Sequence, residues 1–143
     1  MRRPWLAHYP AGVPEKIDES SRETIADVIR HAATAFADRP AAESFGVRLT
    51  YGELVKHAEE IATGLQRLGL QKGDRIAIMM PNVMAYPAIM FGALLGGYVV
   101  VNINPLYTAR ELTHQVNDSG ARVLFVLENF AHTVQEALED LTA

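Results

Sequence analysis

The 143-residue sequence contains no cysteine. Disulfide bonds, thiol chemistry and cysteine metal sites are therefore excluded, and a reducing cytoplasm is compatible with this composition. A basic stripe is missing as well, because only Arg2 and Arg3 are adjacent basic residues and the net charge is −4. Proteins that bind nucleic acid usually carry such a stripe, so we expect no nucleic acid among the partners.

No secretory signal is apparent at the start, because residues 5–17 contain Pro10, Pro14, Glu15 and Lys16 instead of an apolar core. Residues 76–109 lack charge, and residues 83–101 are almost wholly apolar. Length alone would permit a membrane span. However, prolines and glycines interrupt the run, which reads better as strand, helix and strand in the core of a soluble protein.

The chain is long enough for one domain, which would bury roughly two-thirds of its surface on folding. Pro4, Pro10, Gly12 and Pro14 argue against a regular element in residues 1–20. We expect these residues to form an extended arm that lies on some surface. Residues 21–143 are expected to form an incomplete α/β subdomain of a larger N-terminal domain.

Hydrophobic periodicity predicts a helix over residues 22–36, which Asp38, Arg39 and Pro40 end. Two short strands, residues 41–45 and 47–49, follow it. Gly46 between them predicts a tight hairpin.

A capping box, in which a hydroxyl and a carboxylate cap each other's main-chain amides, is the clearest local signal. Thr50 and Glu53 have the required spacing. They predict a helix that carries one apolar stripe as far as Leu68 and stops at Gly69.

From residue 74 onward, strands and helices alternate. Strands are expected at residues 74–80, 98–103 and 122–126, and helices at 83–95, 108–117 and 129–141. The helix at 108–117 opens with a second capping-box pattern, Thr108 and Glu111, and Asn129 is expected to cap the last helix. This order predicts a parallel sheet with right-handed crossover helices. The strands are continuous apolar runs, which is typical of a sheet covered on both faces.

The expected helix at residues 83–95 has no polar face. A helix that is apolar all round is buried on all sides, so it should lie between its own sheet and a second layer. We expect the remaining residues to be too few to supply that layer. We therefore infer that the chain is part of a larger domain.

No catalytic, cofactor-binding or metal-binding residue is predicted. The glycine run 92–97 lacks the lysine and hydroxyl of a phosphate loop and is interpreted as a helix end and turn. Ser119 is assigned to a turn with Asn117, Asp118 and Gly120. Glu59 and Glu60 are interpreted as solvated charges. The histidines, which have no metal-ligand spacing, are His8, His31, His57, His114 and His132.

Several motifs together resemble the adenylate-forming enzymes. They are residues 49–54 (LTYGEL), 73–77 (GDRIA), 80–82 (MPN) and 94–105 (LLGGYVVVNINP). Residues 104–112 (NPLYTAREL), 118–121 (DSGA), 5–14 (WLAHYPAGVP) and 129–133 (NFAHT) are similar to the bacterial long-chain fatty acyl-CoA ligases. Their order and spacing cover nearly the whole chain.

The resemblance implies a two-step reaction in which ATP and a long-chain fatty acid give an acyl-adenylate and pyrophosphate, and CoA then displaces AMP. It implies ATP, Mg²⁺ and CoA as cofactors of the parent enzyme. It also leaves room for peripheral contact of a cytoplasmic protein with the inner membrane. The phosphate loop, the acidic groups and the catalytic lysine of the family lie beyond the matched region. This segment is therefore expected to be inactive scaffold that binds no cofactor.

Two alternatives to an enzyme fragment stay open. The first is a stand-alone, non-catalytic α/β module that binds a partner or dimerises. The second, which rests only on the uncharged run, is a small membrane protein. An isolated chain is expected to expose apolar helix surface and an open sheet edge, both of which favour a homo-oligomer.

Overall fold

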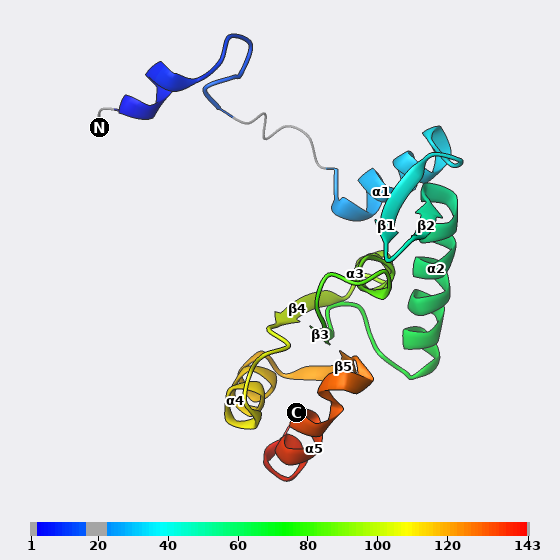
Figure 1. The fold of residues 1–143 in the computed structure, drawn as a ribbon, viewed down its shortest axis with the longest axis vertical. Helices are drawn as coiled ribbons and strands as arrows, with labels where there is room; N and C mark the ends of the chain where they lie inside the picture. Colours follow the sequence, from blue (N-terminus) through cyan, green and yellow to red (C-terminus); the bar gives the residue numbers. More distant parts are fainter. Residues whose placement is uncertain (1–2, 17–22, 143) are drawn as a thin grey trace.

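The computed structural model describes residues 3–16 and 23–142 of the protein (Figure 1). In chain order the elements are η1 (Pro4–His8), α1 (Ile25–Ala35), β1 (Pro40–Ser44), β2 (Val47–Thr50), α2 (Tyr51–Arg67), β3 (Arg75–Met79), α3 (Ala85–Leu95), β4 (Val99–Ile103), α4 (Ala109–Ser119), β5 (Ala121–Val126), η2 (Glu128–Phe130), α5 (Ala131–Ala137) and η3 (Leu138–Asp140). The predicted α/β class is confirmed.

The described strands form two separate sheets. One is the antiparallel hairpin β1–β2, and the other is a parallel sheet in the order β4-β3-β5. Phe45 and Gly46 turn the hairpin with positive φ angles of 50° and 78°. Two such residues are what a tight two-residue hairpin turn requires, so the prediction of a tight hairpin is confirmed.

The central strand β3 separates two hydrophobic cores. On one face Ile76 packs in a cluster with Leu65 of α2 and Ala93 of α3, whereas on the other Ala77 packs with Leu112 and Val116 of α4. Side chains of a strand alternate between faces, so neighbouring residues of β3 serve different cores. The prediction of a sheet covered on both faces is confirmed.

Helix α3 lies between the sheet and α2 (Figure 1). Of all the described elements, α2 makes the most extensive contact with α3. Ala88 also joins a cluster with Ile29 of α1 and Leu54 of α2. The chain thus supplies a second layer itself, and the prediction that its residues are too few was wrong. The spacing of residues within α1 and α2 predicts that each is a helix, but it does not show on which face of the sheet the helix packs. The second layer was therefore not recognised from the sequence.

Within the described residues, three helices begin with complete capping boxes. The predicted boxes at Thr50 and Thr108 are present, and a third joins Thr24 to Asp27 at the start of α1. In that third box the side chain of Asp27 takes the place of the usual glutamate. The expected α1 start at residue 22 lies outside the described residues.

The structure corrects three local predictions. A short 3-10 helix begins at Pro4 where no regular element was expected, and residues 3–16 stand apart from the other elements (Figure 1). Proline is common at the start of a helix, because the main-chain N–H that it lacks would have no hydrogen-bond partner within the helix at that position. Asn129 lies inside η2, and Phe130, which makes no side-chain cap, precedes α5. Helix α4 continues through Ser119, so only Gly120 forms the predicted turn.

Candidate functional site

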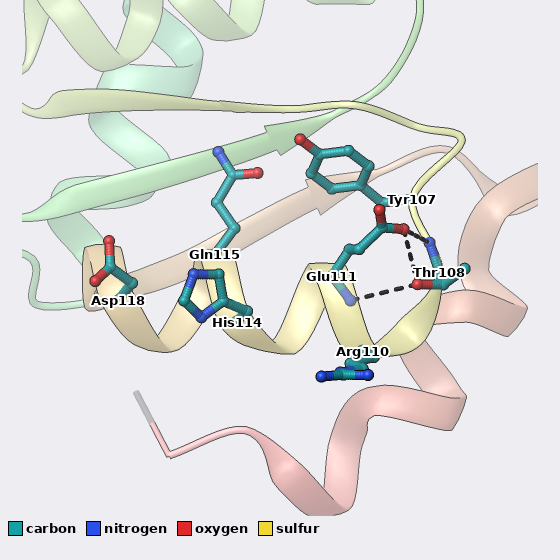
Figure 2. A pocket seen from close by; sticks show the side chains of 7 residues that line it. All are labelled: Tyr107, Thr108, Arg110, Glu111, His114, Gln115 and Asp118. Atoms are coloured by element: carbon teal, nitrogen blue, oxygen red, sulfur yellow. Dashed lines mark hydrogen bonds between the residues drawn. The ribbon is translucent and has the colours of Figure 1, made fainter.

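An open hollow of about 810 Å³ lies along one side of α4 (Figure 2). Its lining residues are Tyr107, Thr108, Arg110, Glu111, His114, Gln115 and Asp118. Except for Tyr107 and Thr108, all of these belong to α4, so their spacing is set by a single helix. The predicted helix cap of Thr108 and Glu111 is present, but no sequence pattern indicates a hollow here.

Thr108 and Glu111 are already bonded to each other in this hollow. The Glu111 carboxylate accepts from the main-chain N–H of Thr108 at 2.9 Å and from its hydroxyl at 2.8 Å. The main-chain N–H donor, followed by the hydroxyl donor, lowers the pKa of Glu111 below its usual value. A carboxylate held in its ionised form by a helix cap is a weak proton acceptor, so its chemistry here is structural.

Gln115 connects this hollow to the edge of the sheet. Its Nε2 donates to the main-chain carbonyl oxygen of Asn102 in β4 at 2.9 Å. Its Oε1 is buried and has no hydrogen-bond partner among the described residues. Asn102 also accepts, through its side-chain Oδ1, a hydrogen bond of 2.8 Å from the hydroxyl of Tyr86 in α3. These contacts could not be predicted from the sequence, because no local pattern joins residues 13 and 16 positions apart.

The five histidines do not converge. His57 lies 3.5 Å from Glu60 on α2, and His132 lies 3.3 Å from the hydroxyl of Thr133. His114 lines the hollow on α4. Within residues 3–16 and 23–142, no group of three or more histidine, aspartate or glutamate side chains could hold a metal ion.

The glycine run is a helix end, as predicted. Gly96 follows the last residue of α3, and Gly97 turns the chain toward β4 with a φ of 78°. Gly92 has a separate role inside α3. A Cβ there would lie 2.7 Å from the carbonyl oxygen of Ala58, so glycine allows α2 and α3 to approach closely.

A second hollow, of about 370 Å³, is lined mainly by apolar side chains of α2 and α3 and by Leu49. His57 and Glu60 also line this hollow.

In the described part of the chain, no helix combines the length and the apolar character that crossing a membrane requires. The uncharged run forms β3, α3 and β4, in the predicted order of strand, helix and strand.

Three comparisons place this architecture among known proteins. Residues 29–143 match the family described as AMP-binding enzyme. The long-chain-fatty-acid–CoA ligase of Salmonella typhimurium is 46% identical over 140 residues, which are 97% of this chain and 25% of that protein. The chain thus spans about a quarter of the length of the curated relatives that it matches.

Solved structures share the fold. A benzoate CoA ligase from Burkholderia xenovorans aligns over 82% of this chain and 24% of its own, with a TM-score of 0.77 and 30% identity. A fatty acyl CoA synthetase from Mycobacterium tuberculosis aligns over 78% of this chain and 23% of its own, with a TM-score of 0.74 and 32% identity. With the family match covering residues 29–143, the chain belongs to the AMP-binding enzymes, and its fold is an N-terminal segment of the adenylate-forming fold.

Proposed function

We propose that residues 1–143 are the N-terminal scaffold of a long-chain fatty acid–CoA ligase, which converts ATP, a fatty acid and CoA to acyl-CoA, AMP and pyrophosphate. The observation that carries the proposal is the 46% identity to a ligase of this name across 97% of the chain. The benzoate ligase shares the fold at lower identity. The similarity of sequence therefore favours the fatty acyl substrate, whereas the fold alone does not.

The role of this segment in the ligase is structural. Its main polar contacts are helix caps and hydrogen bonds or ion pairs that connect strands. They do not bring several reactive side chains together at one point. Asp74 shows the pattern, since its carboxylate accepts from the N–H of Gln71 at 2.7 Å and pairs with Arg122 of β5 at 2.7 Å. The pair with Arg122 joins the start of β3 to β5. We assign no catalytic, cofactor-binding or metal-binding residue to residues 1–143.

In this proposal ATP, CoA and Mg²⁺ bind to residues of a longer chain, outside residues 1–143. The Mg²⁺ ion would neutralise the phosphate charge of ATP. The proposal also includes a cytoplasmic location, peripheral contact with the inner membrane, and self-association of the isolated segment. Self-association is supported by apolar side chains on α1, where Ile25 is 58% exposed and Val28 is 56% exposed.

The test begins with the size of the native protein in extract of the source cells, detected with an antibody against residues 1–143. A band several times larger than 15.7 kDa is expected. That longer protein, once purified, should form acyl-CoA from palmitate, ATP and CoA, whereas residues 1–143 alone should catalyse no ATP–pyrophosphate exchange. Exchange by the short chain would overturn the assignment of a scaffold role.

A stand-alone binding or dimerisation module is the second candidate. It is favoured by the layering of the chain, because α2 and α3 cover one face of the sheet while α4 and α5 pack on the other. A single band at 15.7 kDa in the same extract would support this module and contradict the ligase.

A further inference from the structure

The outer edge of β4 exposes main-chain groups that another strand could pair with. The N–H of Val99 donates to the carbonyl oxygen of Asp74 at 2.9 Å, so the main-chain groups of Val99 point toward β3. Main-chain groups of successive residues in a strand point to opposite sides. Those of Val100 and Asn102 therefore point outward, away from the sheet.

This edge lacks the usual protection. Edge strands commonly carry a charged residue, a proline or a bulge, which discourage pairing with another chain. The sequence of β4 is Val99-Val100-Val101-Asn102-Ile103, and its pairing with β3 runs without a register shift. Short uncharged runs of β-branched residues are prone to intermolecular pairing, and the Val99 side chain is 48% exposed.

The amide of Gln115 occupies one of the outward positions. Its Nε2 donates to the Asn102 carbonyl oxygen at 2.9 Å, which is the bond that the N–H of an added strand would make. A primary amide, like a peptide group, carries one carbonyl and N–H donors. The side chain thus imitates one peptide unit of a neighbouring strand.

Asn102 is held from both faces of the sheet. Gln115 reaches it from α4, which packs on the face that carries Ala77, and Tyr86 reaches it from α3, which packs on the face that carries Ile78. The two contacts use different atoms of Asn102, its main-chain oxygen and its side-chain Oδ1. The edge residue is therefore fixed independently of any added strand.

We propose that Gln115 is an edge guard, which closes the outer edge of β4 against pairing with a strand of a second copy of this chain. The buried Oε1 of Gln115 has no partner in the described part of the chain, and such an acceptor destabilises the folded state. Protection of the edge gives a reason for keeping a glutamine at this position. The proposal is independent of the ligase function, and it implies that any self-association of residues 1–143 uses another surface.

Because the sequence contains no cysteine, a single introduced cysteine can report on the edge. The reporter is Val99→Cys in β4, treated with a short bis-maleimide cross-linker that tolerates small differences in strand register. Gln115→Ala removes the guard, and Gln115→Leu removes its donor while keeping most of its volume. His114→Ala, at the exposed neighbouring position of α4, is the matched control.

Both Gln115 variants should raise the yield of cross-linked dimer about fivefold at equal protein concentration, the factor that corresponds to one neutral hydrogen bond. His114→Ala should leave the yield unchanged. A second reporter, Lys56→Cys on the exposed side of α2, should not respond to any of these changes. A common rise at both reporters would indicate general unfolding and would overturn the proposal. Equal yields at Val99→Cys with and without Gln115, or a Gln115→Leu variant that behaves as wild type, would overturn it too.

Discussion

Gly92 of α3 lies so close to the main chain of Ala58 in α2 that a Cβ at position 92 would stand 2.7 Å from the Ala58 carbonyl oxygen. The same Cβ would lie 2.7 Å from the Cβ of Ile61. Neither neighbour is the far end of a flexible side chain, so the helices themselves would have to separate. This contact therefore fixes the distance between the helix layer and α3, and with it the packing on the sheet.

Gly92→Ala should destabilise the protein by about 1–3 kcal/mol, because inserting a methyl group into a tight contact forces the main chain to shift. Gly64→Ala is the matched control in α2, where an added Cβ would meet no atom within 4 Å. It should stabilise by about 0.5–1 kcal/mol, since alanine favours the helix. Urea unfolding followed by circular dichroism measures both. The same sign for the two variants would contradict the contact.

Thr50→Ala should lower the free energy of unfolding by about 1 kcal/mol, because it removes the side-chain cap of α2. In the structure the Thr50 hydroxyl oxygen accepts from the N–H of Glu53 at 3.2 Å. Thr63→Ala provides the control, since Thr63 lies inside the same helix and only back-bonds to the carbonyl oxygen of Glu59. If both variants unfold at the same urea concentration, the cap contributes nothing.

Acid should weaken the protein through its capping carboxylates. The main-chain N–H of Thr50 and then its hydroxyl lower the pKa of Glu53 below its ordinary value of 4.5. A lowered pKa means that the unfolded chain binds the proton more readily. The contribution is therefore complete above the unfolded pKa, and it is lost as the pH falls through the lower, folded pKa.

Urea midpoints measured between pH 7 and pH 3 (about the range of carboxylate titration) test this effect. Glu53→Gln should make the decline toward acid shallower than in the wild type. Glu59→Gln, a change at an exposed position in the middle of α2, should keep the wild-type slope. A Glu53→Gln slope equal to that of the wild type would show that the cap does not titrate as its geometry requires.

Residues 1–143 alone should self-associate as the concentration rises, through exposed apolar side chains rather than the guarded edge of β4. Ile25 and Val28 of α1 are both more than half exposed. Val28→Lys should lower the average mass measured by sedimentation, because it places a charge in that apolar surface. Thr63→Lys, at an exposed position of α2, controls for added charge. A clean monomer of the wild type at high concentration would contradict self-association.

The order of elements from β1 to β5 was predictable because it depends on short-range signals. Capping at Thr50 and Thr108 involves residues three positions apart, and the apolar runs of β3, α3 and β4 are continuous in the sequence. The third box, at Thr24, escaped prediction because its partner is an aspartate. The cap assigned to Asn129 was wrong because the chain first forms the turn η2 there.

The sequence by itself determined the α/β class, the parallel sheet and the starts of α2 and α4, because periodicity and capping act within a few residues of each other. Only the tertiary structure decided that α2 covers α3, that Gly92 meets Ala58, and that Gln115 reaches Asn102. These contacts join residues 13 or more positions apart. They form when whole elements pack, and the spacing of residues along one element does not specify which neighbour its faces will meet.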